Sequence, residues 1–147
     1  MLSHRCKYLD DIGVSHSPMP CRDRKKQKIR EARFKEQEKI YGFNDSETWD
    51  LDYTLIEFLY TRLKMFLEVN NVELDGIRFK IENDGKFEKI VGTFENNDVE
   101  TITLQQLIED AIEGFKDFLQ SDSTRDDYET AHKHLSRIIE VLPHLWW

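Results

Sequence analysis

An apolar stripe with helical spacing, in the last third of the chain, constrains the fold most. Seven apolar residues recur every three or four positions across residues 104–120: Leu104, Leu107, Ile108, Ala111, Ile112, Phe115 and Leu119. This spacing predicts an amphipathic helix whose apolar side must be covered by other elements. Thr103 and Gln106 have capping-box spacing at its start. Gly114 marks either a close-packing point or a weak point.

Residues 52–69 predict a second helix, capped by Asp50 or Asp52. It is apolar on two sides, and we expect both sides to be buried in the centre of a bundle. The first stripe is Ile56, Leu59, Leu63 and Phe66, and the second side is Leu55, Phe58, Arg62 and Met65.

A third helix is predicted over residues 124–142, where Pro143 stops it. The residues expected to face inward are Tyr128, Ala131, Leu135, Ile138, Ile139 and Leu142.

Between these helices, residues 77–82, 86–94 and 99–103 are rich in β-formers or alternate between apolar and polar. They predict a small antiparallel hairpin or a three-stranded meander. The chain is therefore expected to be a mainly helical α+β domain. Three or four helices pack around an aromatic core, beside the small β element and a basic N-terminal arm.

The N-terminal segment differs from the rest. Residues 1–21 have no period and predict an extended arm. Residues 22–41 predict a helix, ended by Gly42 and exposed over most of its circumference. We therefore divide the chain into a basic arm with its exposed helix, residues 1–41, and an acidic helical body, residues 42–147.

Charge follows nearly the same division. Residues 1–39 carry eleven Lys/Arg and six Asp/Glu, a net of +5, whereas residues 40–147 carry ten and twenty-three, a net of −13. The split indicates two surfaces with different partners, or an arm that docks on a neighbouring copy of a homo-oligomer. The candidate binding residues of the arm are Arg24, Lys25, Lys26, Lys28 and Arg30. Nucleic acid is a second partner for these cations, although the acidic body would repel it.

Three tryptophans are candidate anchors for a partner: Trp49, Trp146 and Trp147. Trp49 precedes a capped helix, and the other two end the chain. Such large amphipathic rings either seal a core or serve at an interface. Trp49 and Trp146 are expected to share one aromatic cluster.

Metal sites have weaker sequence support. The arm contains four residues of the types that hold zinc: His4, Cys6, His16 and Cys21. Their spacing matches no established zinc module, so the alternative is ordinary residues in a flexible arm. Glu129 and His132 have the spacing of half a di-iron site, but no second copy exists. We expect no cofactor.

Catalytic motifs are absent: the chain has no phosphate-binding glycine loop, no CxxC and no HExxH. An enzyme is therefore not expected. The sequence also lacks an apolar run of membrane-spanning length and a signal peptide. These features predict an intracellular protein that contacts no membrane.

Two segments resemble a group of small uncharacterised proteins encoded by tailed bacteriophages. They are GFNDSETWDLDYTLIEFLYTRLKMF (42–66) and LPHLWW (142–147). The shared residues are Gly42, Phe43, Glu47, Thr48, Trp49, Leu51, Asp52, Arg62, Leu63, Lys64, Leu145 and Trp146. The resemblance covers about a fifth of the chain, and the predicted β region departs from it most. It implies a viral origin and carries no catalytic residue.

Three functions remain open at this point. The first is a non-enzymatic phage protein in the host cytoplasm that binds, and inhibits, a host defence protein through its acidic body. The second is a virion component whose basic arm lies on the acidic body of the next copy. The third is a nucleotide-binding sponge or a metal-dependent hydrolase that uses Glu109, Glu113 and Asp117.

Overall fold

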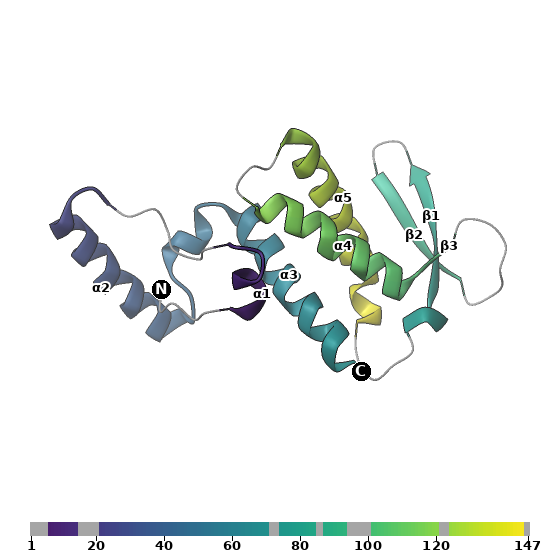
Figure 1. Cartoon of the computed structure of the whole chain (residues 1–147), viewed down its shortest axis with the longest axis horizontal. Helices are drawn as coiled ribbons and strands as arrows, with labels where there is room; N and C mark the ends of the chain where they lie inside the picture. Colours follow the sequence, from purple (N-terminus) through teal and green to yellow (C-terminus); the bar gives the residue numbers. More distant parts are fainter. Residues whose placement is uncertain are drawn as a thin grey trace.

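The computed structural model describes residues 6–14, 21–70, 74–84, 87–93, 101–120 and 124–145, and it is mainly helical with a small sheet. The helices are α1 (Lys7–Asp10), α2 (Arg24–Tyr41), α3 (Leu51–Val69), α4 (Leu104–Leu119) and α5 (Arg125–Val141). Short 3₁₀ turns are η1 (Asp45–Thr48), η2 (Leu74–Gly76) and η3 (Leu142–His144). The predicted α+β class is confirmed. Figure 1 shows α2 standing apart from a body formed by the other helices and the sheet.

The helix ends follow from local capping groups. The Asp50 carboxylate accepts from the Tyr53 amide at the start of α3, and the Thr103 hydroxyl accepts from the Gln106 amide at the start of α4. Thr124 and Asp127 form a complete capping box on α5. Gly42 ends α2 with φ of +81°, a left-handed conformation that other residues rarely adopt.

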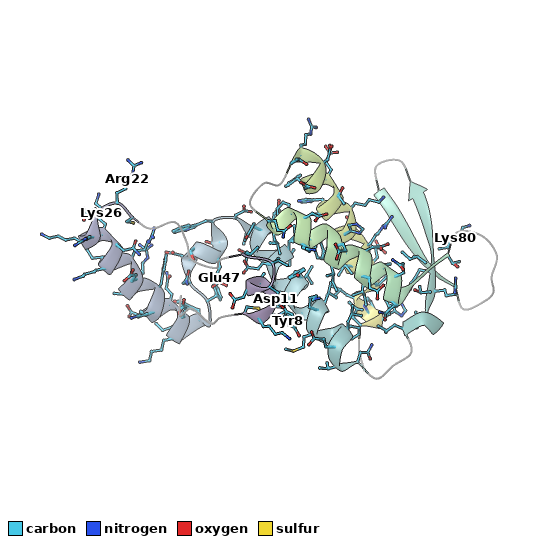
Figure 2. All side chains as sticks on the ribbon, viewed as in Figure 1. Tyr8, Asp11, Arg22, Lys26, Glu47 and Lys80 are labelled. Carbon is cyan, nitrogen blue, oxygen red and sulfur yellow. The ribbon has the colours of Figure 1, made fainter. Side chains whose placement is uncertain are left out.

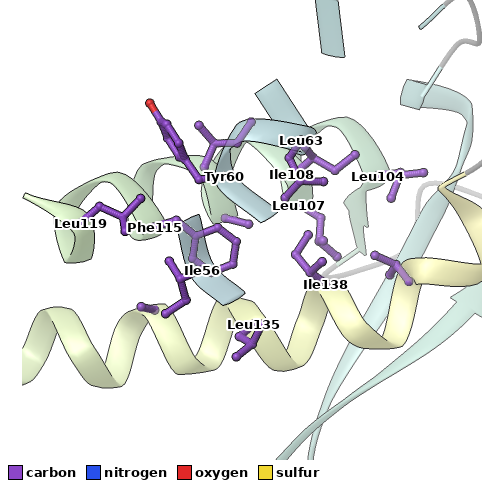
Figure 3. Packing of buried hydrophobic residues seen from close by; sticks show 14 of the residues in the cluster. Ile56, Tyr60, Leu63, Leu104, Leu107, Ile108, Phe115, Leu119, Leu135 and Ile138 are labelled. Carbon is purple, nitrogen blue, oxygen red and sulfur yellow. The ribbon is translucent and has the colours of Figure 1, made fainter. Parts of the chain in front are cut away.

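The core forms where α3, α4 and α5 meet, and the predicted stripe of α4 lies at its centre. All seven stripe residues of α4 are buried. Ile56, Tyr60 and Leu63 of α3 and Leu135 and Ile138 of α5 close over them (Figure 3). Ala131 and Val141 of α5 belong to the same cluster. The core is mostly aliphatic, with Phe115 and Tyr60 among its few aromatic members. Burial of these side chains supplies the main driving force for folding.

Gly114 is a close-packing point and not a weak one. A Cβ atom at this position would lie 2.4 Å from Cδ2 of His134, on the neighbouring helix α5. Glycine therefore sets how closely α4 and α5 approach.

Three predictions about which residues are inward fail. Tyr128 and Ile139 of α5 and Leu142 of η3 are 45–53% exposed. At the end of α5, Val141 is buried in place of Leu142. The predicted end of this helix is confirmed to within one residue, since α5 ends at Val141 and Pro143 lies in the 3₁₀ turn η3 that follows.

The second side of α3 is also not buried. Leu55, Phe58 and Met65 are 42%, 51% and 55% exposed, so α3 lies at the edge of the bundle and not in its centre. One side of α3 suffices for the contact with α4, and no described element covers the other.

The N-terminal segment contributes to the body. Residues 6–14 were expected to be extended, but they contain α1, which packs on α3 with Tyr8 and Leu9 buried. The Tyr8 hydroxyl donates to the Glu68 carboxylate at 2.7 Å. Residues 1–5 and 15–20 lie outside the described residues, so the division at residue 41 stays a prediction.

The sheet contains the predicted antiparallel hairpin, but its three strands are not in the order of the predicted meander. Strands β1 (Arg78–Asp84), β2 (Phe87–Thr93) and β3 (Thr101–Thr103) are antiparallel in the order β2-β1-β3, so the first strand is central. Ile81 pairs with Ile90, and Phe79 pairs with Ile102. The Leu104 amide donates to the Ile77 carbonyl at 2.8 Å, which holds the start of α4, and hence β3, beside β1.

Within the described ranges, no helix is long and apolar enough to cross a membrane.

Gly114→Ala should lower the free energy of unfolding by about 1–3 kcal/mol, because the added methyl group overlaps the His134 ring. Urea denaturation measures this change. Gly76→Ala is the control, since no atom lies within 4 Å of a Cβ there. Equal stability of the two variants would contradict the close approach of α4 and α5.

The α1–α3 contact should make stability depend on pH in the alkaline range. The hydrogen bond to Glu68, followed by burial and the Glu68 charge, raises the pKa of Tyr8 from 10.0 to about 12. A phenol with a higher pKa in the folded state stabilises the fold below about pH 10, and this contribution is lost as the pH approaches 12. Tyr8→Phe should therefore show a shallower loss of unfolding free energy over this interval than the wild type. Tyr41→Phe, at an exposed position, should follow the wild type.

Candidate functional site

Helix α2 is the candidate site that both the sequence and the structure bring forward. Its start is held by the Asp23 carboxylate, which accepts from the amides of Lys25 and Lys26 at 2.8 and 3.3 Å. Phe34 is its one buried residue. The prediction of a helix exposed over most of its circumference is confirmed.

An aromatic contact attaches α2 to the body. The Phe34 and Trp49 rings meet edge to face with centroids 6.0 Å apart. The Arg30 guanidinium lies 5.7 Å from the Phe34 ring centre and 5.9 Å from that of Trp49. Arg33 lies 5.6 Å from the Phe34 ring on the same helix. Stacked cations and edge-to-face rings each add modest stability to such a contact.

Beside this contact, polar side chains join α2 to η1. We call this group, formed by Asn44 and Asp45 with Arg33, Gln37 and Glu38 of α2, the clasp. Asn44 is 1% exposed, and its side chain donates to Glu38 of α2 at 2.6 Å. It also forms a capping box with Glu47. Asp45 receives the Arg33 guanidinium at 3.1 Å, and its amide donates to the Gln37 side chain at 3.0 Å. The clasp fixes where α2 leaves the body.

The predicted basic residues divide into two groups. Arg30 belongs to the attachment, because it lies beside both the Phe34 and the Trp49 ring. The others are exposed toward the start of the helix: Arg24, Lys25, Lys26 and Lys28. Figure 2 shows Arg22 and Lys26 at the end of α2 that lies farthest from the body.

Of the three predicted tryptophan anchors, Trp49 lies in the part of the chain that the structure describes. Trp49 is 58% exposed although it contacts Phe34, so most of its surface remains accessible. Its ring packs against Phe34 and Arg30 of α2. Trp146 and Trp147 lie outside the described residues, and so does the predicted cluster of Trp49 with Trp146.

The acidic counterpart is the outer face of α4. Its four acids are Glu109, Asp110, Glu113 and Asp117. Gln105 donates to Glu109 at 2.5 Å, Gln106 donates to Asp110 at 2.6 Å, and Lys116 lies 3.9 Å from Glu113. Of the predicted capping box, only the bond from the Gln106 amide to the Thr103 hydroxyl forms at the start of α4.

No metal site assembles from the described part of the chain. In the described residues, no three His, Cys, Asp or Glu side chains lie close enough together to hold a metal ion. Glu109, Glu113 and Asp117 are among the described residues, so they do not form such a group. Cys6 and Cys21 are free, partly buried thiols. His4 and His16, the other predicted zinc ligands, lie outside the described residues.

Glu129 and His132, which have the spacing of half a di-iron site, have different partners in the structure. Glu129 pairs with Arg125 at 3.1 Å. His132 Nε2 lies 3.3 Å from Asp52 Oδ2, an ion-pair distance without hydrogen-bond geometry. The Tyr128 hydroxyl donates to the same oxygen at 3.1 Å, and this bond, together with the Asp52 charge, raises the pKa of Tyr128. The cluster links α5 to the start of α3.

Sequence reasoning missed one surface. Leu51, Leu55, Phe58, Met65 and Val69 form an exposed apolar face along α3. The sequence contains this signal in the 3- and 4-residue spacing of Leu55, Phe58 and Met65, but the same spacing is what a buried second side of the helix would show.

Comparison with protein-family models, with curated proteins and with solved structures found no match to this chain. The resemblance to bacteriophage proteins therefore rests on the sequence motif and stays a prediction.

Asn44→Ala should loosen α2 at its clasp, because it removes both the cap of η1 and the bond to Glu38. The expected cost is about 1–2 kcal/mol. Hydrogen exchange should speed up in α2, and Trp49 fluorescence should shift as its ring loses Phe34. Thr124→Ala removes a capping box of the same kind from α5 and should leave α2 unchanged. Unchanged exchange in α2 of the Asn44 variant would show that the clasp does not hold this helix.

Proposed function

We propose that this protein is a non-catalytic binding protein whose helix α2 docks on an acidic protein surface. The observation that supports it best is the placement of α2, which projects from the body with one buried side chain. An exposed helix joined to the body by a defined clasp can present its outer surface to a partner without disturbing the core.

The position of the cations in α2 adds to this argument. Arg24, Lys25 and Lys26 form the first turn, which contains no acidic residue. Positive charges at this end oppose the helix dipole, each at a cost of about 0.3–1 kcal/mol at low ionic strength. Folding of the chain alone does not explain them, whereas contact with carboxylates would offset this cost.

The chain itself supplies a suitable acceptor. The outer face of α4 carries four acids, and the body as a whole carries a net charge of −13 over residues 40–147. Docking of α2 from one copy on the body of the next is a head-to-tail contact, which builds rings or open arrays. With the phage resemblance, such an array would be a component of the virion.

A second candidate partner is a host protein with a basic surface, bound by the same acidic body in the infected cytoplasm. The exposed α4 acids favour it, because complementary charge speeds and orients association. Nucleotide binding and metal-dependent hydrolysis are not proposed, because Glu109, Glu113 and Asp117 do not converge.

Charge reversal at the start of α2 tests the docking proposal. At about 0.05 M salt, the wild-type protein should form species larger than a dimer in sedimentation velocity, and about 0.5 M salt should disperse them. Lys25→Glu/Lys26→Glu should abolish these species at low salt.

Lys35→Glu/Lys39→Glu is the matched control, since it makes the same charge change on the same helix farther from the first turn. It should retain most of the assembly. A wild-type protein that forms no salt-sensitive species, or equal losses in both variants, would overturn docking of α2 on another copy.

A further inference from the structure

The exposed side of α3 carries a largely apolar face, interrupted by Arg62. Five large apolar side chains form it, and their exposed fractions are 66% for Leu51, 42% for Leu55, 51% for Phe58, 55% for Met65 and 45% for Val69. Together they expose apolar surface on the order of 400 Å², within the size range of the largest patches found on monomeric proteins. Patches of this size in folded proteins commonly mark interaction sites.

The spacing of this face is that of a coiled-coil seam. With Arg62 included, its positions are 51, 55, 58, 62, 65 and 69, which alternate steps of four and three residues. This is the a/d pattern by which one helix packs along another. Ile56, Tyr60 and Leu63, which lie on the other side of the helix, are buried in the core. Helix α3 thus has one side for its own core and a second side of helix-pairing character.

The seam matches itself when one copy is reversed. In an antiparallel pair with its centre at position 60, Leu51 faces Val69 and Leu55 faces Met65 of the other copy. Phe58 then faces Arg62. Each layer joins an a position to a d position, as antiparallel helix pairs require. A surface that matches its own reverse is what a two-fold dimer uses.

The single charge in the seam selects the antiparallel direction. The Arg62 guanidinium carbon lies 4.0 Å from the Phe58 ring centre, and Nη1 donates to the Thr61 hydroxyl at 2.8 Å. In a parallel pair, Arg62 would face Arg62 of the second copy, and the like charges would repel. In the antiparallel pair it faces a Phe58 ring, a favourable partner for a guanidinium.

The available area fits a dimer of modest affinity. Two such faces with the polar atoms at their edges would bury on the order of 1,000 Å² in total, near the lower limit for a specific interface.

We infer that α3 pairs antiparallel with α3 of a second copy, through the seam of Leu51, Leu55, Phe58, Arg62, Met65 and Val69, to form a closed two-fold dimer. This contact is separate from the docking of α2. The α3 contact buries apolar surface between copies that each carry a net charge of −8. Added salt should therefore strengthen this contact by screening the repulsion between the copies. Salt weakens the α2 contact, so the two proposals can fail independently.

Sedimentation equilibrium at about 0.5 M salt, where docking of α2 is suppressed, tests the dimer. The wild-type protein should be a monomer–dimer mixture at micromolar concentrations and should not exceed a dimer. Met65→Lys places an unpaired charge in the seam of each copy and should raise the dimer Kd about a hundredfold.

Ile139→Lys is the matched control, because Ile139 is an apolar residue of α5 with nearly the same exposed fraction, 53%. It should dimerise like the wild type, and both variants should keep the wild-type circular dichroism spectrum. A wild-type protein that is monomeric up to about 1 mM would overturn the inference and leave the face to a different partner. A Met65→Lys variant that dimerises normally, or an equal loss in Ile139→Lys, would also overturn it.

Discussion

The packing of one side of α3 against α4 determines much of what this protein presents to its surroundings. Ile56, Tyr60 and Leu63 enter the core beside the continuous stripe of α4, and this contact sets the rotation of α3 about its axis. The opposite side of the helix must then face outward. The start of α3 also positions η1, from which the clasp at Asn44 directs α2 away from the body. Both proposed contact surfaces follow from this one rotation.

The two surfaces differ in their physical character, and this gives them separate roles. The start of α2 offers charge with little buried apolar area, so its contacts depend on salt and on the partner's charge. The seam of α3 offers apolar area with a single arginine, which contributes direction more than affinity. A closed dimer through α3 would carry two α2 helices. Such a unit could bind two acidic surfaces at once, which raises the apparent affinity when the geometry permits it.

Sequence reasoning predicted elements whose causes are local. The stripe of α4, the caps at Asp50 and Thr103, and the end of α2 at Gly42 all depend on residues within a few positions of one another. Sequence reasoning failed for features that depend on contacts between residues far apart in the chain. Tyr8 has no helical pattern around it, and α1 is held by Glu68, sixty residues away. The two sides of α3 look alike in the sequence, and only the fold shows that α4 takes one of them. For the candidate site, the exposed cations of α2 were predictable from composition. The role of Arg30 in the attachment was not, because it depends on Trp49.

Disulfide trapping would test the antiparallel seam most directly, in a protein with Cys6 and Cys21 replaced by serine. In the proposed dimer, residue 55 faces residue 65 of the other copy, within the Cα separation of about 7 Å that a disulfide permits. Two residues 55 would lie about 15 Å apart along the helices. The account predicts that Leu55→Cys/Met65→Cys forms a covalent dimer on oxidation and that Leu55→Cys alone does not. A covalent dimer from Leu55→Cys alone would indicate parallel pairing, and no dimer from the double variant would show that this face does not pair in the proposed register; either result would contradict the account.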